Sequence, residues 1–108
     1  MKLYINIDQE GFELDVPDQL LRETQTICAD MDKEFDRGQQ MGRYWIDQPD
    51  DFQRCQVVAN KLVDAYCLED KRNFYVMAAY ILNKMPNARE VVVNTGSEIQ
   101  DIDILTHE

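Results

Sequence analysis

The chain has few of the residues from which active sites are commonly built. Among its 108 residues there is one histidine, His107, which is the penultimate residue, and one serine, Ser97. A chain end is usually mobile, so it positions a catalytic base or a metal ligand poorly. The sequence therefore argues against Ser-His and Cys-His dyads, the H-E-x-x-H zinc site and the H-x-E deaminase site.

Glycine and cysteine are also scarce and widely spaced. The four glycines stand at positions 11, 38, 42 and 96, so neither a G-x-G-x-x-G loop nor a P-loop can be written. Cys28, Cys55 and Cys67 form no C-x-x-C pair and no disulfide framework, which excludes the common zinc and redox motifs. All three lie among apolar residues in segments that we predict to be helical. We therefore expect reduced core cysteines, and no cofactor.

Long hydrophobic runs are missing as well. The longest apolar run, residues 74–82, is less than half of the roughly 20 residues that cross a bilayer. The first apolar stretch turns acidic at Asp8, before a secretory leader can form. We therefore expect a soluble cytoplasmic protein without membrane contacts. The length fits one domain spanning residues 1–108.

Positive charge is scarce relative to negative charge. The chain has 11 Lys and Arg residues against 21 Asp and Glu residues, a formal net charge of −10. Because binding to phosphates requires clusters of Lys and Arg, this balance argues against nucleic acid as a direct partner. Residues 1–36 carry ten acids and three bases, whereas residues 37–72 carry six of each. We expect a partner contact in this neutral middle.

Hydrophobic spacing predicts two hairpins around a helical middle. Alternation over residues 2–8 and 12–16 predicts a β-hairpin whose turn includes Gly11. Helical spacing predicts one helix from Pro17 to Gly38 and a second from Pro49. A third helix, at about residues 73–85, follows the polar residues 69–73, although one continuous helix over residues 50–85 is an alternative.

The remaining segments complete the predicted fold. Residues 39–48 show no clear period, so we expect an irregular connection with at most one helical turn around residues 44–46. Residues 91–93 and 99–104 predict strands joined by a turn at residues 94–97. The order ββαααββ predicts a two-layer α+β fold, with an antiparallel sheet made of both hairpins and about three helices on one face.

Acidic residues suggest two further kinds of site. Residues 30–36 begin like a calcium loop, but position six holds Phe35 instead of glycine and position twelve holds Met41 instead of glutamate. We interpret this segment as a solvated helix face. Two carboxylates facing each other across a cleft, one with a raised pKa, would suffice for an enzyme with or without Mg²⁺. That reading stays open as an alternative.

Two apolar features indicate surfaces for a protein partner. The segment from Met41 to Ile46 contains Arg43, Tyr44 and Trp45, and such residue types are enriched at interface hot spots. Its alternative is that Trp45 fills the core between the first two helices. The third helix is apolar nearly all round, so an uncovered stripe with Tyr75 or Tyr80 would support a homodimer. Its alternative is that the first two helices close over it.

An acidic patch is a third candidate surface. If the two hairpins pair side by side, the open face of the sheet carries four acids: Glu13, Asp15, Asp101 and Asp103. Such a patch suits a basic protein partner. The alternative is a solvated face that discourages edge aggregation.

Several stretches resemble small acidic gammaproteobacterial proteins of uncharacterised function. They are residues 31–41, Trp45, residues 52–59, and residues 79–82 before Pro86 with the Val-rich strand that follows. The resemblance covers roughly residues 30–94 and implies a bacterial cytoplasmic origin. It implies no activity and no catalytic residue.

We therefore expect a non-enzymatic domain that binds an unknown protein partner. The candidate contact residues are Met41, Arg43, Tyr44, Trp45, Tyr75 and Tyr80. One alternative is an acidic protein that occupies the basic nucleic-acid-binding surface of a partner. The other is the carboxylate-dependent enzyme.

Overall fold

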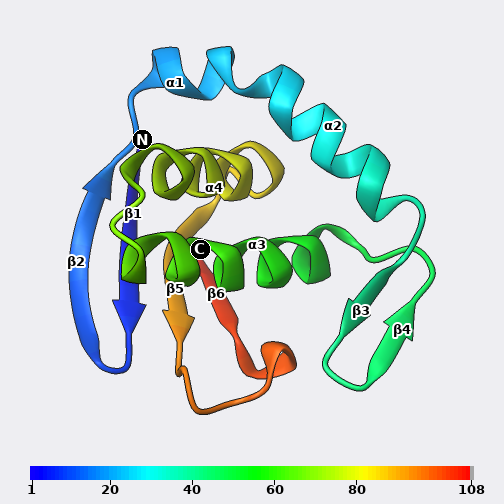
Figure 1. Cartoon of the computed structure of the whole chain (residues 1–108). Helices are drawn as coiled ribbons and strands as arrows, with labels where there is room; N and C mark the ends of the chain where they lie inside the picture. Colours follow the sequence, from blue (N-terminus) through cyan, green and yellow to red (C-terminus); the bar gives the residue numbers. More distant parts are fainter. Residues whose placement is uncertain (108) are drawn as a thin grey trace.

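The main sheet and the two longest helices form the body of the protein. In the computed structural model, which describes residues 1–107, helices α3 and α4 lie across one face of a four-stranded sheet (Figure 1). The α+β fold class is confirmed. The sheet strands are β1 (Lys2–Ile7), β2 (Glu10–Asp15), β5 (Ala88–Val93) and β6 (Asp103–Thr106), and the two helices are α3 (Asp51–Cys67) and α4 (Lys71–Lys84).

Four shorter elements and one helical turn complete the structure. Helices α1 and α2 pack on α4, and strands β3 and β4 pair with each other apart from the main sheet (Figure 1). Their bounds are α1 (Asp18–Glu23), α2 (Gln25–Phe35), β3 (Gln39–Met41), β4 (Tyr44–Ile46) and the 3₁₀ turn η1 (Ile99–Asp101). None of the helices within residues 1–107 has both the length and the hydropathy required to cross a bilayer.

The sheet is mixed, which corrects the prediction of a purely antiparallel sheet. The strand order is β2-β1-β5-β6, so the two hairpins do lie side by side. Strand β1 pairs antiparallel with β2 but parallel with β5. Alternation predicts the partner within each hairpin, whereas tertiary packing decides which strands of the two hairpins meet. The order ββαααββ is also wrong, because it lacks β3 and β4 and divides the helices differently.

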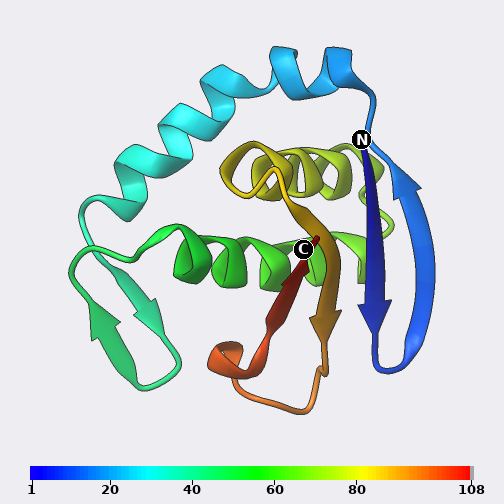
Figure 2. The same ribbon diagram turned by 180° about the vertical axis from the view of Figure 1, so that it is seen from behind.

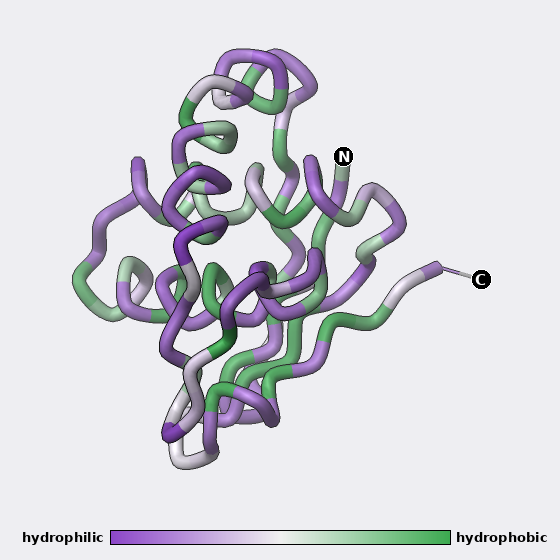
Figure 3. Tube along the Cα trace, turned by 90° about the vertical axis from the view of Figure 1, so that its right-hand side faces the viewer, coloured by the Kyte–Doolittle hydropathy of each residue, from purple (hydrophilic) through white to green (hydrophobic). Residues whose placement is uncertain are grey.

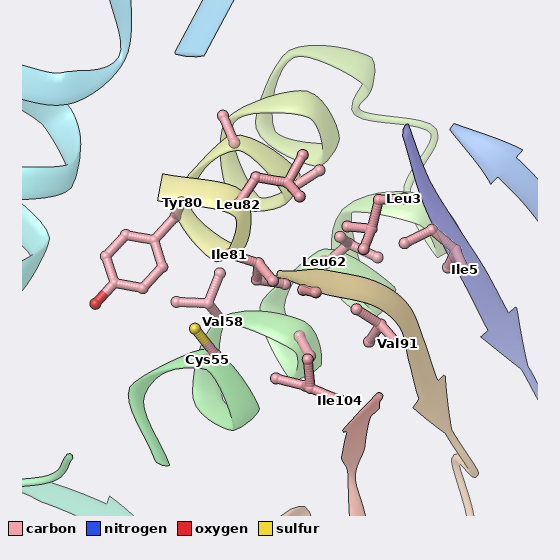
Figure 4. Close-up of a cluster of buried hydrophobic side chains, with 14 of the residues drawn as sticks. Leu3, Ile5, Cys55, Val58, Leu62, Tyr80, Ile81, Leu82, Val91 and Ile104 are labelled. Carbon is pink, nitrogen blue, oxygen red and sulfur yellow. The ribbon is translucent and has the colours of Figure 1, made fainter. Parts of the chain in front are cut away.

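The hydrophobic core lies between the sheet and the α3–α4 pair. Figure 4 shows Leu3, Ile5 and Val91 of the sheet facing Leu62 and Ile81 of the helices, all fully buried. In Figure 3 hydrophobic and hydrophilic residues are interspersed along the trace, as expected where elements have one buried and one exposed side.

All three cysteines are free, and two of them are core residues. Cys28 and Cys55 are buried, as predicted, but Cys67 is exposed at the end of α3. The core prediction is therefore wrong for Cys67. Cys67 is the last residue of α3 and lies on the side of the helix that faces solvent.

The open face of the sheet carries three of the four predicted acids. Figure 2 looks onto this face, which the helices of residues 1–107 leave uncovered. Glu13, Asp15 and Asp103 are exposed there. Asp101 is not on the face, because it belongs to η1, where its carboxylate accepts a hydrogen bond from the Glu98 amide at 3.3 Å.

The first hairpin turns at Asp8 and Gln9 and not at Gly11. Asp8 and Gln9 have φ of 53° and 72°, as both central residues of a type I′ turn require. Gly11 lies within β2, directly beneath the ring of Tyr4, where a Cβ would be 2.3 Å from the Tyr4 hydroxyl oxygen. The Asp8 carboxylate accepts hydrogen bonds from the Thr95 hydroxyl and amide, which hold its pKa below the usual value.

The predicted first helix is divided at Thr24 into α1 and α2. The buried Thr24 side chain donates to the Leu20 carbonyl at 2.7 Å, a contact that bends helices. The predicted end of this helical region at Gly38 is confirmed, since Gly38 has a φ of 99°.

A break between α3 and α4 was predicted and is confirmed. The Asp70 amide donates to the Ala65 carbonyl at 2.8 Å and the Glu69 amide to the Tyr66 carbonyl at 3.2 Å. These are the two hydrogen bonds of a Schellman motif, and Glu69 holds its left-handed position with a φ of 57°. The sequence offers no glycine here, which is why a continuous helix stayed open.

Replacing Glu69 with glycine should stabilise the protein. Glycine adopts a positive φ without the steric cost that Glu69 bears, so Glu69→Gly should raise the free energy of unfolding by about 0.5–1 kcal/mol. Lys61→Gly, at an exposed position inside α3, is the matched control and should lower it by about 1 kcal/mol. Urea unfolding measures both, and destabilisation by Glu69→Gly would contradict the assignment of the turn.

Candidate protein-contact surface

Residues 39–46 form a short β-hairpin. Met41 pairs with Tyr44, Gln40 with Trp45 and Gln39 with Ile46, around a two-residue turn in which Gly42 has a φ of 59°. The expected irregular connection is therefore wrong, and the helical turn around residues 44–46 is an extended strand. Figure 1 shows the hairpin at one end of α3, away from the main sheet.

One face of the hairpin is turned toward the protein. Met41 is fully buried and Ile46 packs against the core. The Gln100 side-chain amide donates to the Met41 carbonyl, which attaches β3 to the η1 segment. Met41 therefore anchors the hairpin to the body of the protein. It is not available for a partner contact, although the sequence indicates it as a candidate contact residue.

Trp45 lies on the opposite face, and the core-filling alternative is wrong for it. The side chain is 57% exposed. Its ring rests on Gly38, where a Cβ would approach a ring carbon to 2.3 Å, and its indole N–H donates to Asp47 at 2.9 Å. Gly38 thus provides both the positive φ that ends the helical region and the space that the indole occupies. The ring is held in one orientation while more than half of it stays in solvent.

Tyr44 is more exposed still, at 65%, but it points to the other side of β4. Arg43 occupies the turn between the two strands and is also exposed. We call Arg43, Tyr44 and Trp45 the hairpin surface. Its two aromatic side chains flank one strand and do not form a single flat patch, so a partner has to grip the hairpin from both sides or use one side only.

Arg54 of α3 closes the base of the hairpin. Its guanidinium donates to the Asp36 carboxylate at 2.8 Å, before the hairpin, and to the Pro49 carbonyl at 2.8 Å, after it. The same group lies 5.6 Å from the centre of the Phe35 ring. Both chain ends that lead into the hairpin are thereby fixed to the first turn of α3.

Asp32 of α2 accepts hydrogen bonds from two other helices. Arg54 of α3 donates at 3.2 Å, the Tyr80 hydroxyl of α4 donates at 2.7 Å, and Lys84 of α4 forms an ion pair with the second oxygen. Burial opposes the ionisation of Asp32. The bonds from Lys84, Tyr80 and Arg54 outweigh it and hold the Asp32 pKa below its usual value.

Tyr80 is a structural residue of this cluster. It is fully buried, and Figure 4 shows its ring pointing away from the aliphatic core residues. Burial, together with the hydrogen bond to Asp32, raises the pKa of its hydroxyl far above the usual value, so the group remains a donor. Burial likewise raises the pKa of Cys55 to about 12, which leaves that cysteine an unreactive thiol.

The open stripe predicted on the third helix is closed. α1 and α2 pack on α4 from one side and α3 packs on it from the other, which is the alternative that the sequence left open. Tyr75 is half-buried near the start of α4, at the far end of the helix pair from the hairpin. The structure brings neither Tyr75 nor Tyr80 to the hairpin surface.

A polar cleft that the sequence did not indicate lies beside the hairpin. It is bounded by β3, α3 and the loop before η1, and its lining includes Asn60, Asp64, Ser97 and Glu98. Within residues 1–107 no group of three or more His, Cys, Asp or Glu side chains is arranged to hold a metal ion.

Comparisons with family models, with curated proteins and with solved structures find no match for this chain.

The contribution of Asp32 to stability should depend on pH. Because its pKa is lower in the folded state, this contribution is complete above the ordinary value of 3.8 and is lost as the pH falls through the lower, folded-state value. Asp32→Asn should lower the free energy of unfolding at pH 7 by about 2–3 kcal/mol, and the difference from wild type should shrink toward pH 3. Urea unfolding from pH 3 to 7 measures this, with the exposed Asp30→Asn as control. A difference independent of pH would contradict the ionised cluster.

Replacing Arg54 with lysine should loosen the hairpin without unfolding the protein. A lysine cannot reach Asp32, Asp36 and the Pro49 carbonyl at once, so Arg54→Lys should cost about 1–2 kcal/mol. Amide hydrogen exchange over residues 36–49 should accelerate more than exchange in β1 and β5. Lys33→Arg, an exposed exchange on α2, is the control. Equal acceleration everywhere would mean that Arg54 does not hold the hairpin in particular.

Proposed function

We propose that this chain is a non-enzymatic protein-binding domain and that its partner docks on the hairpin surface. The observation that carries the proposal is the state of Trp45, a large aromatic side chain that is mostly in solvent yet already held by Gly38 and Asp47. Single exposed apolar residues are common on proteins and need no explanation. A fixed indole, with Arg43 in the adjoining turn and Tyr44 on the other side of the same strand, has the composition of an interface hot spot.

The energetics support this use of Trp45. An indole side chain has roughly 250 Å² of surface, so covering its exposed part yields about 3.5 kcal/mol at about 25 cal/mol per Å². Binding normally costs about 0.5–1.5 kcal/mol for each flexible side chain that becomes ordered. That cost is small for Trp45, because the hydrogen bond to Asp47 already restricts its rotamer.

The proposal extends to the setting in which the partner is met. Following the resemblance of residues 30–94, we infer a bacterial protein that acts in the cytoplasm. An acidic domain covering a basic nucleic-acid-binding surface is less well supported. On the open sheet face Glu13 is already paired with Lys2 at 3.3 Å, and Tyr4, Val92 and Leu105 interrupt the acids.

Trp45→Ala should abolish capture of the partner that docks on the hairpin surface. Affinity purification from bacterial lysate should recover the same proteins with wild type and with Leu68→Ala, and lose the protein that docks on the hairpin surface with Trp45→Ala. Leu68 is the matched control, because it is 79% exposed and lies at the other end of α3. Once a partner is identified, its dissociation constant should rise at least about tenfold with Trp45→Ala.

Salt separates this function from its acidic alternative. Capture through the hairpin surface should persist when salt is raised from about 0.15 M to about 0.5 M, whereas a contact resting on the net charge should be lost. Equal capture by wild type and Trp45→Ala would overturn the hairpin proposal, and so would capture that disappears at the higher salt.

A further inference from the structure

Strand β2 offers unpaired main-chain groups at one edge of the sheet. Met1 and Val16 exchange two main-chain hydrogen bonds, at 2.7 and 2.8 Å, at the start of the β1–β2 ladder. Because the register is regular, the bonded positions of β2 continue at every second residue, namely Leu14, Phe12 and Glu10. The residues between them direct their N–H and C=O groups away from β1. These residues are Gly11, Glu13 and Asp15.

An aromatic cleft runs along the helix-facing side of this edge. Its volume is about 710 Å³, and it lies between β2 and the turn that joins α3 to α4. Phe12 stacks on Tyr66 with ring centroids 5.6 Å apart, and Phe74 meets Tyr75 edge to face at 5.9 Å. Tyr66 is 49% exposed, so the cleft opens to solvent beside the free main-chain groups.

Acidic side chains border the same edge on both sides. Glu13 and Asp15 project from the opposite face of β2, which is the open face of the sheet. Glu69 and Asp70 stand on the far side of the cleft, where Lys71 is the one basic lining residue. Along the same stretch of β2 the edge therefore offers unpaired main-chain donors and acceptors, an aromatic cleft on one face of the sheet and negative charge on the other.

We propose that β2 receives an extended segment of a partner protein as a fifth strand of the sheet, and that this segment alternates apolar with Lys or Arg residues. Side chains of an added strand point alternately to the two faces. The apolar ones enter the aromatic cleft, and the basic ones meet Asp15 and Glu13. The ion pair of Glu13 with Lys2 at 3.3 Å is exposed, so it costs little to exchange for a basic side chain of the partner. The main-chain hydrogen bonds supply affinity and the alternation supplies specificity, as in other cases of strand addition.

The same charges disfavour a second copy of the chain as the occupant. When two antiparallel β2 strands pair with their faces matched, Glu13 of one copy lies directly opposite Gly11, Glu13 or Asp15 of the other. The acids of both strands then share one face, and like charges on facing strands are destabilising. The same acidic side chains on an edge strand therefore disfavour pairing with a second copy and favour pairing with a basic strand.

The test uses paired nine-residue peptides on an array, probed with the full chain. One member of each pair carries Lys at alternate positions with Val, Ile, Leu, Phe or Tyr between them, and the other carries the same residues in two blocks. We expect the full chain to bind alternating peptides in preference to their block isomers. Equal binding to both members would show attraction by charge alone and would overturn strand addition, as would no binding.

Hydrogen exchange on the unmodified chain gives the signature of the mechanism. With a bound alternating peptide, the amides of Gly11, Glu13 and Asp15 should exchange more slowly, because they acquire partners. The amides of Phe12 and Leu14, which are already bonded to β1, should change little. Protection confined to residues 39–46, or equal on odd and even residues of β2, would overturn the proposal. Self-association of the chain without peptide would also overturn it.

Variants separate the main chain from the side chain at one position. Glu13→Pro removes an outward N–H, which edge strands tolerate, and should weaken peptide binding about tenfold. Glu13→Thr keeps that N–H and should weaken binding only a few-fold, with a smaller salt dependence. Tyr66→Ala should also weaken it, whereas Trp45→Ala should leave it unchanged. Full binding by Glu13→Pro would overturn strand addition, and full peptide binding by Trp45→Ala separates this site from the hairpin surface.

Discussion

The carboxylate of Asp32 is the group on which the arrangement of the other elements depends. It stands on α2, and its hydrogen-bond donors come from α3 and α4. Helix α2 buries only Cys28 and Phe35, so hydrophobic burial alone holds it weakly against the body. The charged contacts of Asp32 therefore decide where α2 lies, and the position of α2 decides where the chain enters the hairpin.

Arg54 extends this constraint to the hairpin itself. A partly buried ion pair contributes little net stability, because desolvation offsets much of the attraction, but it penalises other geometries strongly. Within residues 1–107 every buried side-chain nitrogen and oxygen has a hydrogen-bond partner, so this penalty is not incurred in the observed arrangement. The intact cluster thus adds little to the free energy of unfolding, but removing one member leaves its partners unpaired and is costly, so the cluster fixes one geometry. A hairpin with three-residue strands could not fix its own orientation.

The sequence predicts those elements that are long enough for their hydrophobic pattern to repeat. The first hairpin, the helix starting after Pro49 and the end at Gly38 agree with the structure because several side chains support each of them. The hairpin of residues 39–46 was missed because its strands are too short for alternation to appear. Its candidate residues were grouped by residue type, but their exposure depends on register. The register of the hairpin places Met41 in the core and Trp45 in solvent. Residue types alone do not show which of the two is buried.

Tyr80 shows a second limit of sequence reasoning. A helix that is apolar all round has to be covered on all sides, yet its sequence does not say what covers it. The cover proves to be α1 and α2, attached through a tyrosine hydroxyl that reaches an aspartate 48 positions away. The polar end of Tyr80 was the available signal, since a buried tyrosine usually finds a partner for its hydroxyl. That partner was unidentifiable without the path of the chain.

The net charge of −10 is distributed so that the two proposed surfaces differ in kind. The hairpin surface lies in the neutral middle of the sequence, and Arg54, the most buried arginine near it, is engaged within the fold. The β2 edge lies in the first third of the sequence, which contains ten acidic and three basic residues. The two surfaces also lie at opposite ends of the α3–α4 pair, so occupation of one does not block the other. A contact at the hairpin then rests on apolar burial and tolerates salt, whereas a contact at the edge combines main-chain pairing with charge and weakens with it. Taken over the whole chain, the acidity only excludes classes of partner. Its concentration in the first third of the sequence supports a basic partner at the β2 edge and not at the hairpin surface.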